Sequence, residues 1–327
     1  MKHISHTIAP KDAGLNIDLA WVKINTGLSR RKIRQIIDSG GAYCNGKRIR
    51  FASYKVKVGD ELKLIFDLNT LKNNGAKDII INSNDILYED GNLIALNKPP
   101  SLASQPTKNP NTQTVIKALM NYYQQKLSVD KLEHELILCH RLDLETSGVL
   151  LIAKSKAYAS FVMDQFKEKL VSKTYHAICV GIPKKKKWTC ENYLSLISKK
   201  TGLVKSVRAG GRWASTSFEV LGISHKHNLS LIACHPVTGR SHQIRVHLAD
   251  LDLPILGDKK YGGDIAHQNL REFRGLSALI SLHHMLHARK IRFKLESKGN
   301  KISLTASYPD NFAALLKVLG RVDVSFS

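Results

Sequence analysis

The apolar positions of the first 66 residues follow the period of a helix and then that of a strand. Residues 15–27 and 29–41 carry apolar side chains at helical spacing, so two short helices are predicted there. Ser29 is the expected N-cap of the second helix, and the glycine pair 40–41 is expected to end it. The predicted buried stripe of this helix consists of Ile33, Ile36 and Ile37.

Alternating apolar and polar positions then indicate short strands. Asn45–Gly46 is the expected tight turn of a hairpin in residues 42–49, and Gly59–Asp60 is the expected turn of a second hairpin. Residues 1–66 are therefore predicted to form a small helix–strand domain. Residues 67–84 are rich in Asn, Lys and Gly at both ends, and we expect a linker that contains a short strand.

Residues 85–320 mix strand and helix patterns too irregularly for a doubly wound parallel sheet. We predict an α+β domain with flanking helices on a mixed, largely antiparallel sheet, followed by a tail at 321–327. The period of residues 241–251 fits a strand or a helix, and we favour a helix with Ser241 as its N-cap. The expected strands are 92–98, 148–154, 174–181, 215–222 and 229–236, and the expected helices are 114–127 and 156–170.

The charge of the chain changes this picture by pointing to a polyanionic partner. Fifty Lys and Arg against 27 Asp and Glu give a net charge of +23, which is typical of nucleic-acid binding but also fits a generally basic surface. Between Lys23 and Lys57 one acid, Asp38, faces ten basic residues. The candidate phosphate contacts are Arg30, Arg31, Lys32, Arg34, Lys47 and Arg48.

Cysteine and histidine spacing gives little support to a metal centre. The five cysteines are scattered, odd in number and free of any CxxC pair, as expected for reduced thiols. His283 and His287 are four residues apart, but the glutamate of a metalloprotease helix is missing. The N-terminus lacks the apolar core of a signal peptide, and no apolar run reaches a membrane span. We expect a cytoplasmic monomer without cofactor, metal or membrane.

Four segments of the second domain carry the candidate chemistry. They read "LNKPPSLASQPT", "HRLDLETSG", "FKEKLVSKTYHAICVG" and "HPVTGRSHQIRVHLADLDLPILGDKKYGG". Each has a simpler interpretation: Asp143 could be a structural acid paired with Arg141, Tyr175 a core aromatic, and Arg245 a surface charge. An aspartate beside two apolar segments is costly without a partner, so Asp143 needs an ion pair or a chemical role.

Together the four segments resemble the ordered motifs of the RluA-type pseudouridine synthases. The basic N-terminal module resembles the S-four-like RNA-binding domain that many members of this family carry, so the resemblance spans nearly the whole chain. It implies that uridine in RNA is isomerised to pseudouridine: the glycosidic bond breaks, the base turns and carbon 5 joins the ribose. No cofactor or metal is implied.

The resemblance assigns roles residue by residue. Asp143 matches the catalytic aspartate, which acts on the ribose or on the base, and Tyr175 matches the tyrosine that lies against the uracil. Arg245 matches the arginine paired with the aspartate, and Arg141 the residue that fills the place of a flipped-out nucleotide. Leu286 matches a segment that closes the apolar side of the pocket, although a plain core role fits equally well.

The first motif departs from the family pattern, and the substrate stays open. Ser101 and Gln105 stand where family members often have glycine and histidine, which bears on substrate preference more than on activity. Family habit favours large-subunit ribosomal RNA, with transfer RNA second. The rival functions are a non-catalytic RNA-binding or ribosome-assembly protein and a metal-dependent nuclease or deaminase, and the latter lacks its HxE…PCxxC signature.

Overall fold

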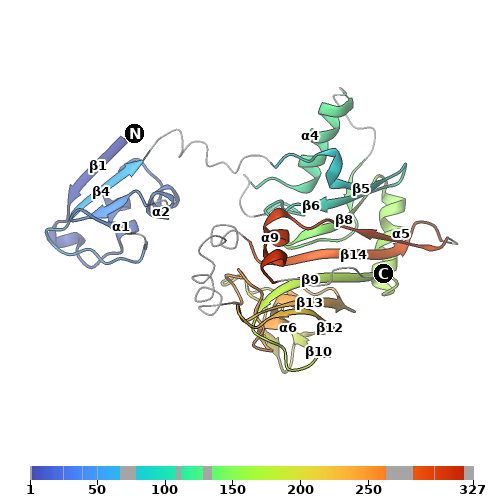
Figure 1. Ribbon diagram of the computed structural model, residues 1–327. Helices are drawn as coiled ribbons and strands as arrows, with labels where there is room; N and C mark the ends of the chain where they lie inside the picture. The colour runs from blue at the N-terminus through green and yellow to red at the C-terminus, as the bar shows by residue number, and fades with distance from the viewer. Residues whose placement is uncertain are drawn as a thin grey trace. The chain divides into compact units, whose positions relative to one another are not determined.

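The chain divides into two compact units, Met1–Asp78 and Ile79–Ser327. The computed structural model (Figure 1) describes residues 2–24, 26–38, 40–49, 51–66, 79–107, 112–127, 135–262, 283–297 and 299–319. The predicted linker lies outside these residues except for 79–84. There Ile81 is buried in the core of the second unit, and a short 3-10 helix, η2 (Ser83–Asp85), takes the place of the expected strand.

The first unit packs two helices against a four-stranded sheet in the order β1-β4-β2-β3. The predicted stripe of the second helix is fully buried, as its spacing required. The Asn45–Gly46 turn is confirmed, since both residues have positive φ between paired strands. The elements are β1 (Lys2–Thr7), η1 (Pro10–Asp12), α1 (Ile17–Lys23), α2 (Arg30–Asp38), β2 (Ala42–Cys44), β3 (Lys47–Ile49) and β4 (Glu61–Phe66).

The second predicted hairpin of this unit is wrong. Gly59 does turn the chain, with a φ of +80°, but the residues before it form no strand apart from one bridge at Lys55. Instead β4 pairs with β1 and β2, which lie far from it in sequence.

The second unit is the predicted α+β domain, built on an 11-stranded sheet that is antiparallel except where β14 runs parallel to β8. Its central order is β11-β10-β12-β13-β9-β14-β8-β6-β5, with β15 beside β14 and β7 beside β8. Its strands are β5 (Ile86–Glu89), β6 (Leu93–Lys98), β7 (Ile137–Leu138), β8 (Ser147–Ala153), β9 (Ser172–Val180), β10 (Lys187–Leu194), β11 (Ser206–Val207), β12 (Arg212–Ser224), β13 (Leu229–Pro236), β14 (Leu286–Lys294) and β15 (Lys301–Thr305).

Helices cover both faces of this sheet around β6 and β8, which explains why these two strands are almost entirely buried. The helices are α4 (Val115–Leu127), α5 (Lys156–Lys167), α6 (Gln243–Ala249) and α9 (Asp310–Val318). In β6, Ile94 and Leu96 pack with α4, whereas Leu93 and Ala95 pack with α5. All seven residues of β8 are buried for the same reason. None of the described helices is long and apolar enough to cross a bilayer.

The ambiguous segment at 241–251 contains a helix, as predicted, but with a different start. The N-cap of α6 is His242, in the left-handed region at a φ of +53°. Ser241 instead accepts a 2.7 Å hydrogen bond from Arg141 Nη2. Local sequence favoured serine because its side chain caps helices well, whereas here a tertiary contact uses that hydroxyl.

Candidate active site

Asp143 lies in the turn between β7 and β8, and the proline-rich first motif holds this turn in place. Leu144 O accepts hydrogen bonds from Ser101 N at 3.0 Å and from Lys98 Nζ at 3.1 Å. Ser104 Oγ donates to Leu142 O at 2.8 Å and accepts from Leu142 N at 3.1 Å. The residues on both sides of Asp143 are therefore fixed by one loop, which favours a defined position for its carboxylate.

Two positions around this turn need a special backbone. Ser101 has a φ of +65°, a conformation that glycine adopts more readily, which gives a physical reason for the glycine expected there. Gly148, at a φ of +110°, lies so close to Ala288 that a Cβ would collide with its carbonyl. The Thr-Ser-Gly sequence after Asp143 thus permits the parallel contact between β8 and β14.

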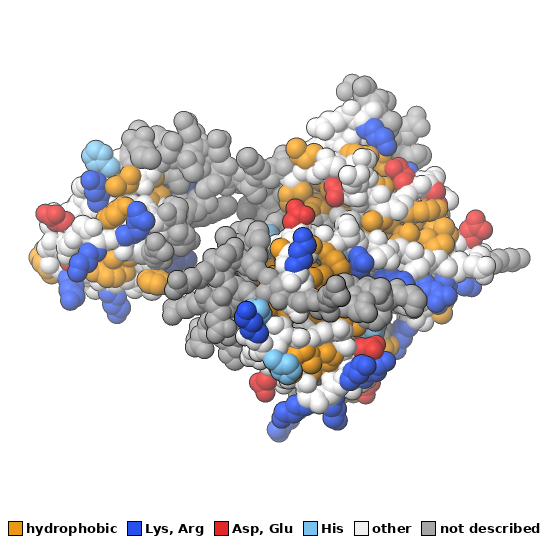
Figure 2. Space-filling view, in the orientation of Figure 1, with side chains coloured by type: hydrophobic (Ala, Val, Ile, Leu, Met, Phe, Trp, Pro, Cys, Tyr) orange, Lys and Arg blue, Asp and Glu red, His pale blue; other side chains and the backbone are white. Residues whose placement is uncertain are grey.

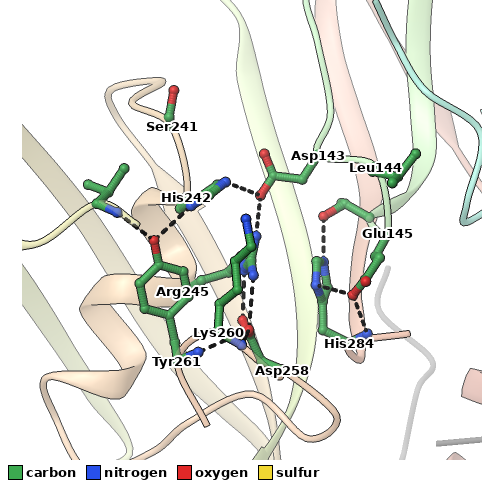
Figure 3. A network of polar contacts seen from close by, with 12 residues as sticks. Asp143, Leu144, Glu145, Ser241, His242, Arg245, Asp258, Lys260, Tyr261 and His284 are labelled. Atoms are coloured by element: carbon green, nitrogen blue, oxygen red, sulfur yellow. Dashed lines mark hydrogen bonds and ion pairs between the residues drawn. The ribbon is translucent and has the colours of Figure 1, made fainter. Parts of the chain in front are cut away.

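Arg245 of α6 bridges two carboxylates (Figure 3). Its Nη1 donates to Asp143 Oδ2 at 2.9 Å, while Nε and Nη2 donate to both oxygens of Asp258 at 2.6 and 2.9 Å. The side chains of Arg245 and Asp258 are 6% and 1% exposed, whereas that of Asp143 is 26% exposed. The buried fork between Arg245 and Asp258 therefore fixes the guanidinium, which presents its remaining edge to the more accessible carboxylate.

The pKa of Asp143 lies below its ordinary value. Burial raises it, but the positive charges of His242 and Arg245 and the hydrogen bond from Arg245 more than offset this effect. Burial lowers the pKa of His242 itself to about 4, so Arg245 is the cation of these two that persists at neutral pH. Asp143 is accordingly held as an ionised carboxylate, the form that a nucleophile or a base requires.

His242 joins the carboxylate to a second hydrogen-bonded group. Its Nε2 lies 3.9 Å from Asp143 Oδ2, and its Nδ1 is 2.7 Å from the hydroxyl of Tyr261. That hydroxyl accepts a 2.8 Å bond from Val204 N. The left-handed backbone at His242 is a strained conformation for a non-glycine residue, and it aims the imidazole at Asp143.

A third group supports the turn from the segment just before β14. His284 Nε2 is 2.8 Å from Thr146 Oγ1, and His284 Nδ1 lies 3.2 Å from Glu145 Oε2 without the alignment of a hydrogen bond. Burial raises the pKa of Glu145, but the close side chain and charge of His284, together with a 3.4 Å hydrogen bond from His284 N, lower it by more. These contacts tie the residues after Asp143 to the strand that begins at Leu286.

The residues singled out in the second domain converge on one cleft. Tyr175, near the start of β9, and Leu286, the first residue of β14, line it together with Asp143 and Arg245. Arg141 lies on its exposed rim, where it is held by Ser241. Burial and the charge of Asp143 raise the pKa of Tyr175, so its hydroxyl is protonated at neutral pH. An aromatic face, an ionised acid and an apolar wall thus share one cleft.

Four of the six predicted RNA contacts in the first unit fall into two groups. Figure 2 shows Lys and Arg spread over the visible face of this unit with few acidic side chains between them. Arg30 and Arg34 both donate through Nε to Oδ2 of the fully buried Asp18, at 2.9 and 2.6 Å. Lys32 and Lys47 are exposed and face solvent.

Two further predicted RNA contacts stand apart from these groups. Arg48 is exposed and donates to the hydroxyl of Tyr43 through Nε and Nη2. Arg31 lies in α2, with its side chain outside the described part of the chain. The sequence analysis did not predict that Arg30 and Arg34 bind the buried carboxylate of Asp18, because Asp18 lies on the preceding helix, before the basic segment begins.

The histidine pair at 283 and 287 has ordinary partners. His287 is fully buried and bonds Ser147 Oγ through Nδ1 at 2.9 Å, and His283 Nδ1 is 3.4 Å from Ser101 Oγ. Across the residues that the structure describes, no three His, Cys, Asp or Glu side chains converge as metal ligands.

Sequence reasoning missed the role of three residues in this site. Asp258, His242 and Lys98 lie inside the motifs quoted above, but nothing in the local pattern distinguishes them from their charged neighbours. Their burial beside Asp143 or its turn emerges only from the fold.

Comparison with known proteins identifies the families that this chain resembles. The model of the RNA pseudouridylate synthase family matches residues 92–250, and that of the S4 domain matches residues 22–62. An uncharacterized RNA pseudouridine synthase of Chlorobaculum parvum is 31% identical, covering 94% of this chain and 95% of its own. Ribosomal large subunit pseudouridine synthase C of Rickettsia prowazekii is 35% identical over 80% and 83%. The structure of human RNA pseudouridylate synthase domain containing 4 covers 72% and 93%, with 28% identity and a TM-score of 0.58.

Proposed function

This chain belongs to the RluA-type family of RNA pseudouridine synthases, and we propose that it isomerises uridines of large-subunit ribosomal RNA with Asp143 as the catalytic aspartate. The observation that carries the proposal is the bridge from Asp143 through Arg245 to Asp258 at the cleft of Tyr175 and Leu286. It keeps one accessible carboxylate ionised beside a surface that fits a flat base.

The cleft supports the following course of reaction. The target uridine leaves its stack, at a cost of a few kcal/mol, and enters the cleft. Its base lies against Tyr175 with Leu286 on the apolar side, while Arg141 at the rim fills the vacated place in the RNA. Asp143 then attacks the ribose or the uracil ring, and both routes require the carboxylate that Arg245 maintains.

The rest of the isomerisation needs no added reactant. The electrons of the glycosidic bond stay with the uracil, which turns, and carbon 5 forms the new bond to the ribose. If Asp143 has bonded to the ribose, carbon 5 displaces it as the new bond forms; if Asp143 has added to the uracil ring, it is expelled as the proton of carbon 5 is removed. In both routes carbon 5 loses its proton and nitrogen 1, which kept the electrons of the glycosidic bond, takes one up. We propose that Tyr175, which lines the cleft together with Asp143, assists this transfer as a relay: its hydroxyl gives up its own proton as it accepts the proton of carbon 5.

The substrate proposal rests on relatives and on charge. The Rickettsia prowazekii relative is named as a ribosomal large-subunit enzyme, and an S4 domain precedes the catalytic unit in this chain. Transfer RNA is the second candidate. The monomeric state and cytoplasmic location expected from the sequence stay predictions, which sedimentation and cell fractionation can test.

Tritium release from RNA labelled at carbon 5 of its uridines tests the proposal. Wild type should release tritium from unmodified large-subunit ribosomal RNA, and Asp143→Asn should release none while its affinity for RNA stays within about two-fold. This expectation follows because the isosteric amide keeps the shape of the carboxylate but is neither nucleophile nor base. Labelled transfer RNA is assayed separately. Tight binding of both RNAs without release by wild type would instead favour a non-catalytic assembly protein.

A further inference from the structure

An exposed pair of aromatic residues lies beside the cleft, at one end of the strands β10 and β12, which are neighbours in Figure 1. Tyr193 and Trp213 are cross-strand partners in the antiparallel register and so share one face of the sheet. The two residues are 49% and 36% exposed. Together with Lys169 and Arg240 they form what we call the aromatic–basic shelf.

The shelf is joined rigidly to the catalytic cleft. Arg240 lines the cleft, and its Nε donates to Trp213 O at 3.0 Å. Gln243, which is buried at the start of α6, accepts from Arg240 N at 3.0 Å and donates to Ser215 O at 2.9 Å. One buried amide therefore holds the rim of the cleft against the strand that carries Trp213.

The charges of the shelf favour a ligand that carries both a negative charge and a flat ring. The exposed Lys169 places its Nζ 5.5 Å from the ring centroid of Trp213, so a cation already lies against this ring. Arg240 is exposed as well. Glu191 is an acidic residue on the same face of the sheet, and its carboxylate accepts a 2.9 Å hydrogen bond from Ser215 Oγ.

We propose that the shelf binds a single-stranded nucleotide of the substrate RNA next to the target uridine. This inference rests on the proposed function and adds a second contact outside the reacting cleft. A base stacks on Trp213 beside Tyr193, and Lys169 moves from the ring to the adjoining phosphate, which Arg240 also approaches. Aromatic side chains flanked by cations bind single strands in this way and tolerate any base, because every base has a flat face.

Tryptophan fluorescence tests the shelf without any catalytic turnover. The chain has three tryptophans, of which Trp21 is fully buried and Trp188 partly buried against Phe218. A short oligouridylate should quench the emission saturably, and Trp213→Phe should abolish most of the quenching. Poly-glutamate serves as an anion without bases and should leave the emission unchanged. Absence of quenching, or quenching that persists in Trp213→Phe, would overturn the proposal, and equal quenching by poly-glutamate would indicate an acidic protein partner.

Steady-state tritium release gives the second test. Trp213→Ala should raise KM for the labelled RNA about ten-fold with kcat unchanged, because one stacked base is lost. Trp213→Phe keeps a flat ring and should stay within about three-fold of wild type. Lys169→Gln should raise KM, whereas the charge-matched control Lys226→Gln, in the turn at the other end of β12, should not.

The two proposals fail differently. If wild type releases no tritium, the proposed activity fails while the fluorescence result still decides the shelf. If wild type is active and Trp213→Ala has an unchanged KM, the shelf is refuted and the activity stands.

Discussion

At the scale of single residues, the proposed role of Asp143 as the catalytic aspartate requires its carboxylate to be ionised. Asp143 has a lowered pKa, so it is ionised throughout the neutral range and loses its charge only as pH falls below its ordinary value of 3.8. Arg245 is the persistent cause, and Asp258 fixes Arg245 in turn. An acid limb of kcat caused by Asp143 should therefore lie below pH 4.

Arg245→Lys should separate charge from geometry. Lysine keeps a cation near Asp258 but lacks the fork that reaches both carboxylates, so Asp143 is displaced and partly released from its counter-ion. We expect kcat to fall about 100-fold and the acid limb to move to higher pH, because burial then raises the pKa of Asp143. The exposed Arg292→Lys is the matched control. A pH profile of kcat that coincides with wild type would contradict the role of Arg245.

The site shows how far residue types in motifs can be interpreted. Asp143, Tyr175, Arg245 and Leu286 were brought together by family resemblance, and the fold does place them on one cleft. Asp258 was not assigned, although it is the more buried partner of Arg245. The sequence shows which charged residues the chain contains. Which of them become buried next to each other, as Arg245 and Asp258 do, depends on how segments distant in the chain pack together.

At the scale of elements, the turn that carries Asp143 depends on a buried cation. Lys98 is completely buried, and its ammonium donates to the carbonyls of Pro99, Leu102 and Leu144 at 2.9, 2.9 and 3.1 Å. Burial lowers its pKa to about 7, and the charge of Asp143 opposes this effect. Three acceptors match the three N–H groups of an ammonium, which joins the end of β6 to the turn after β7.

Lys98→Met should therefore destabilise the second unit and impair the reaction together. The carbonyls of Pro99 and Leu102 lose this donor, at about 1–3 kcal/mol for each group left unpaired, while Leu144 O keeps its hydrogen bond from Ser101 N. We expect a loss of unfolding free energy of about 3 kcal/mol or more, and a lower kcat at temperatures where the variant is still folded. Denaturant unfolding and tritium release measure the two effects.

Lys154→Met is the matched control, because Lys154 follows β8 and pairs with the partly exposed Glu89 at 2.8 Å. Loss of this pair, whose side chains are 13% and 28% exposed, should cost about 1.5 kcal/mol, less than the loss of Lys98, and leave kcat unchanged. Equal effects of the two variants on stability and on kcat would refute a positioning role for Lys98.

Elements were predictable where one period dominated. The apolar β8 and the amphipathic α5 fall where their patterns placed them, within a few residues at each end. The failure at Gly59–Asp60 has a physical cause: a turn residue predicts that the chain reverses, but not which strand the next segment joins. β4 pairs with β1 and with β2 of the 42–49 hairpin because the apolar faces of the three strands form one core.

At the scale of the whole molecule, a net charge of +23 predicts RNA binding that weakens steeply with salt. The basic residues of the first unit do not contribute equally. Arg30 and Arg34 neutralise the buried Asp18, whose pKa burial raises but the two guanidinium groups lower by more. Lys32 and Lys47 are exposed, so their ammonium groups are accessible to RNA phosphates.

Two double variants should therefore behave in opposite ways. Lys32→Glu with Lys47→Glu should reduce the slope of log K against log salt by about two or more, since each lost phosphate contact removes about one, and should leave thermal stability unchanged. Arg30→Ala with Arg34→Ala leaves the buried carboxylate of Asp18 without its cations and should lower the unfolding free energy of the first unit by about 3 kcal/mol. Salt-dependent RNA binding and thermal unfolding distinguish the two. If the lysine pair leaves the slope unchanged while the arginine pair reduces it without loss of stability, Arg30 and Arg34 grip the RNA and Asp18 only orients them.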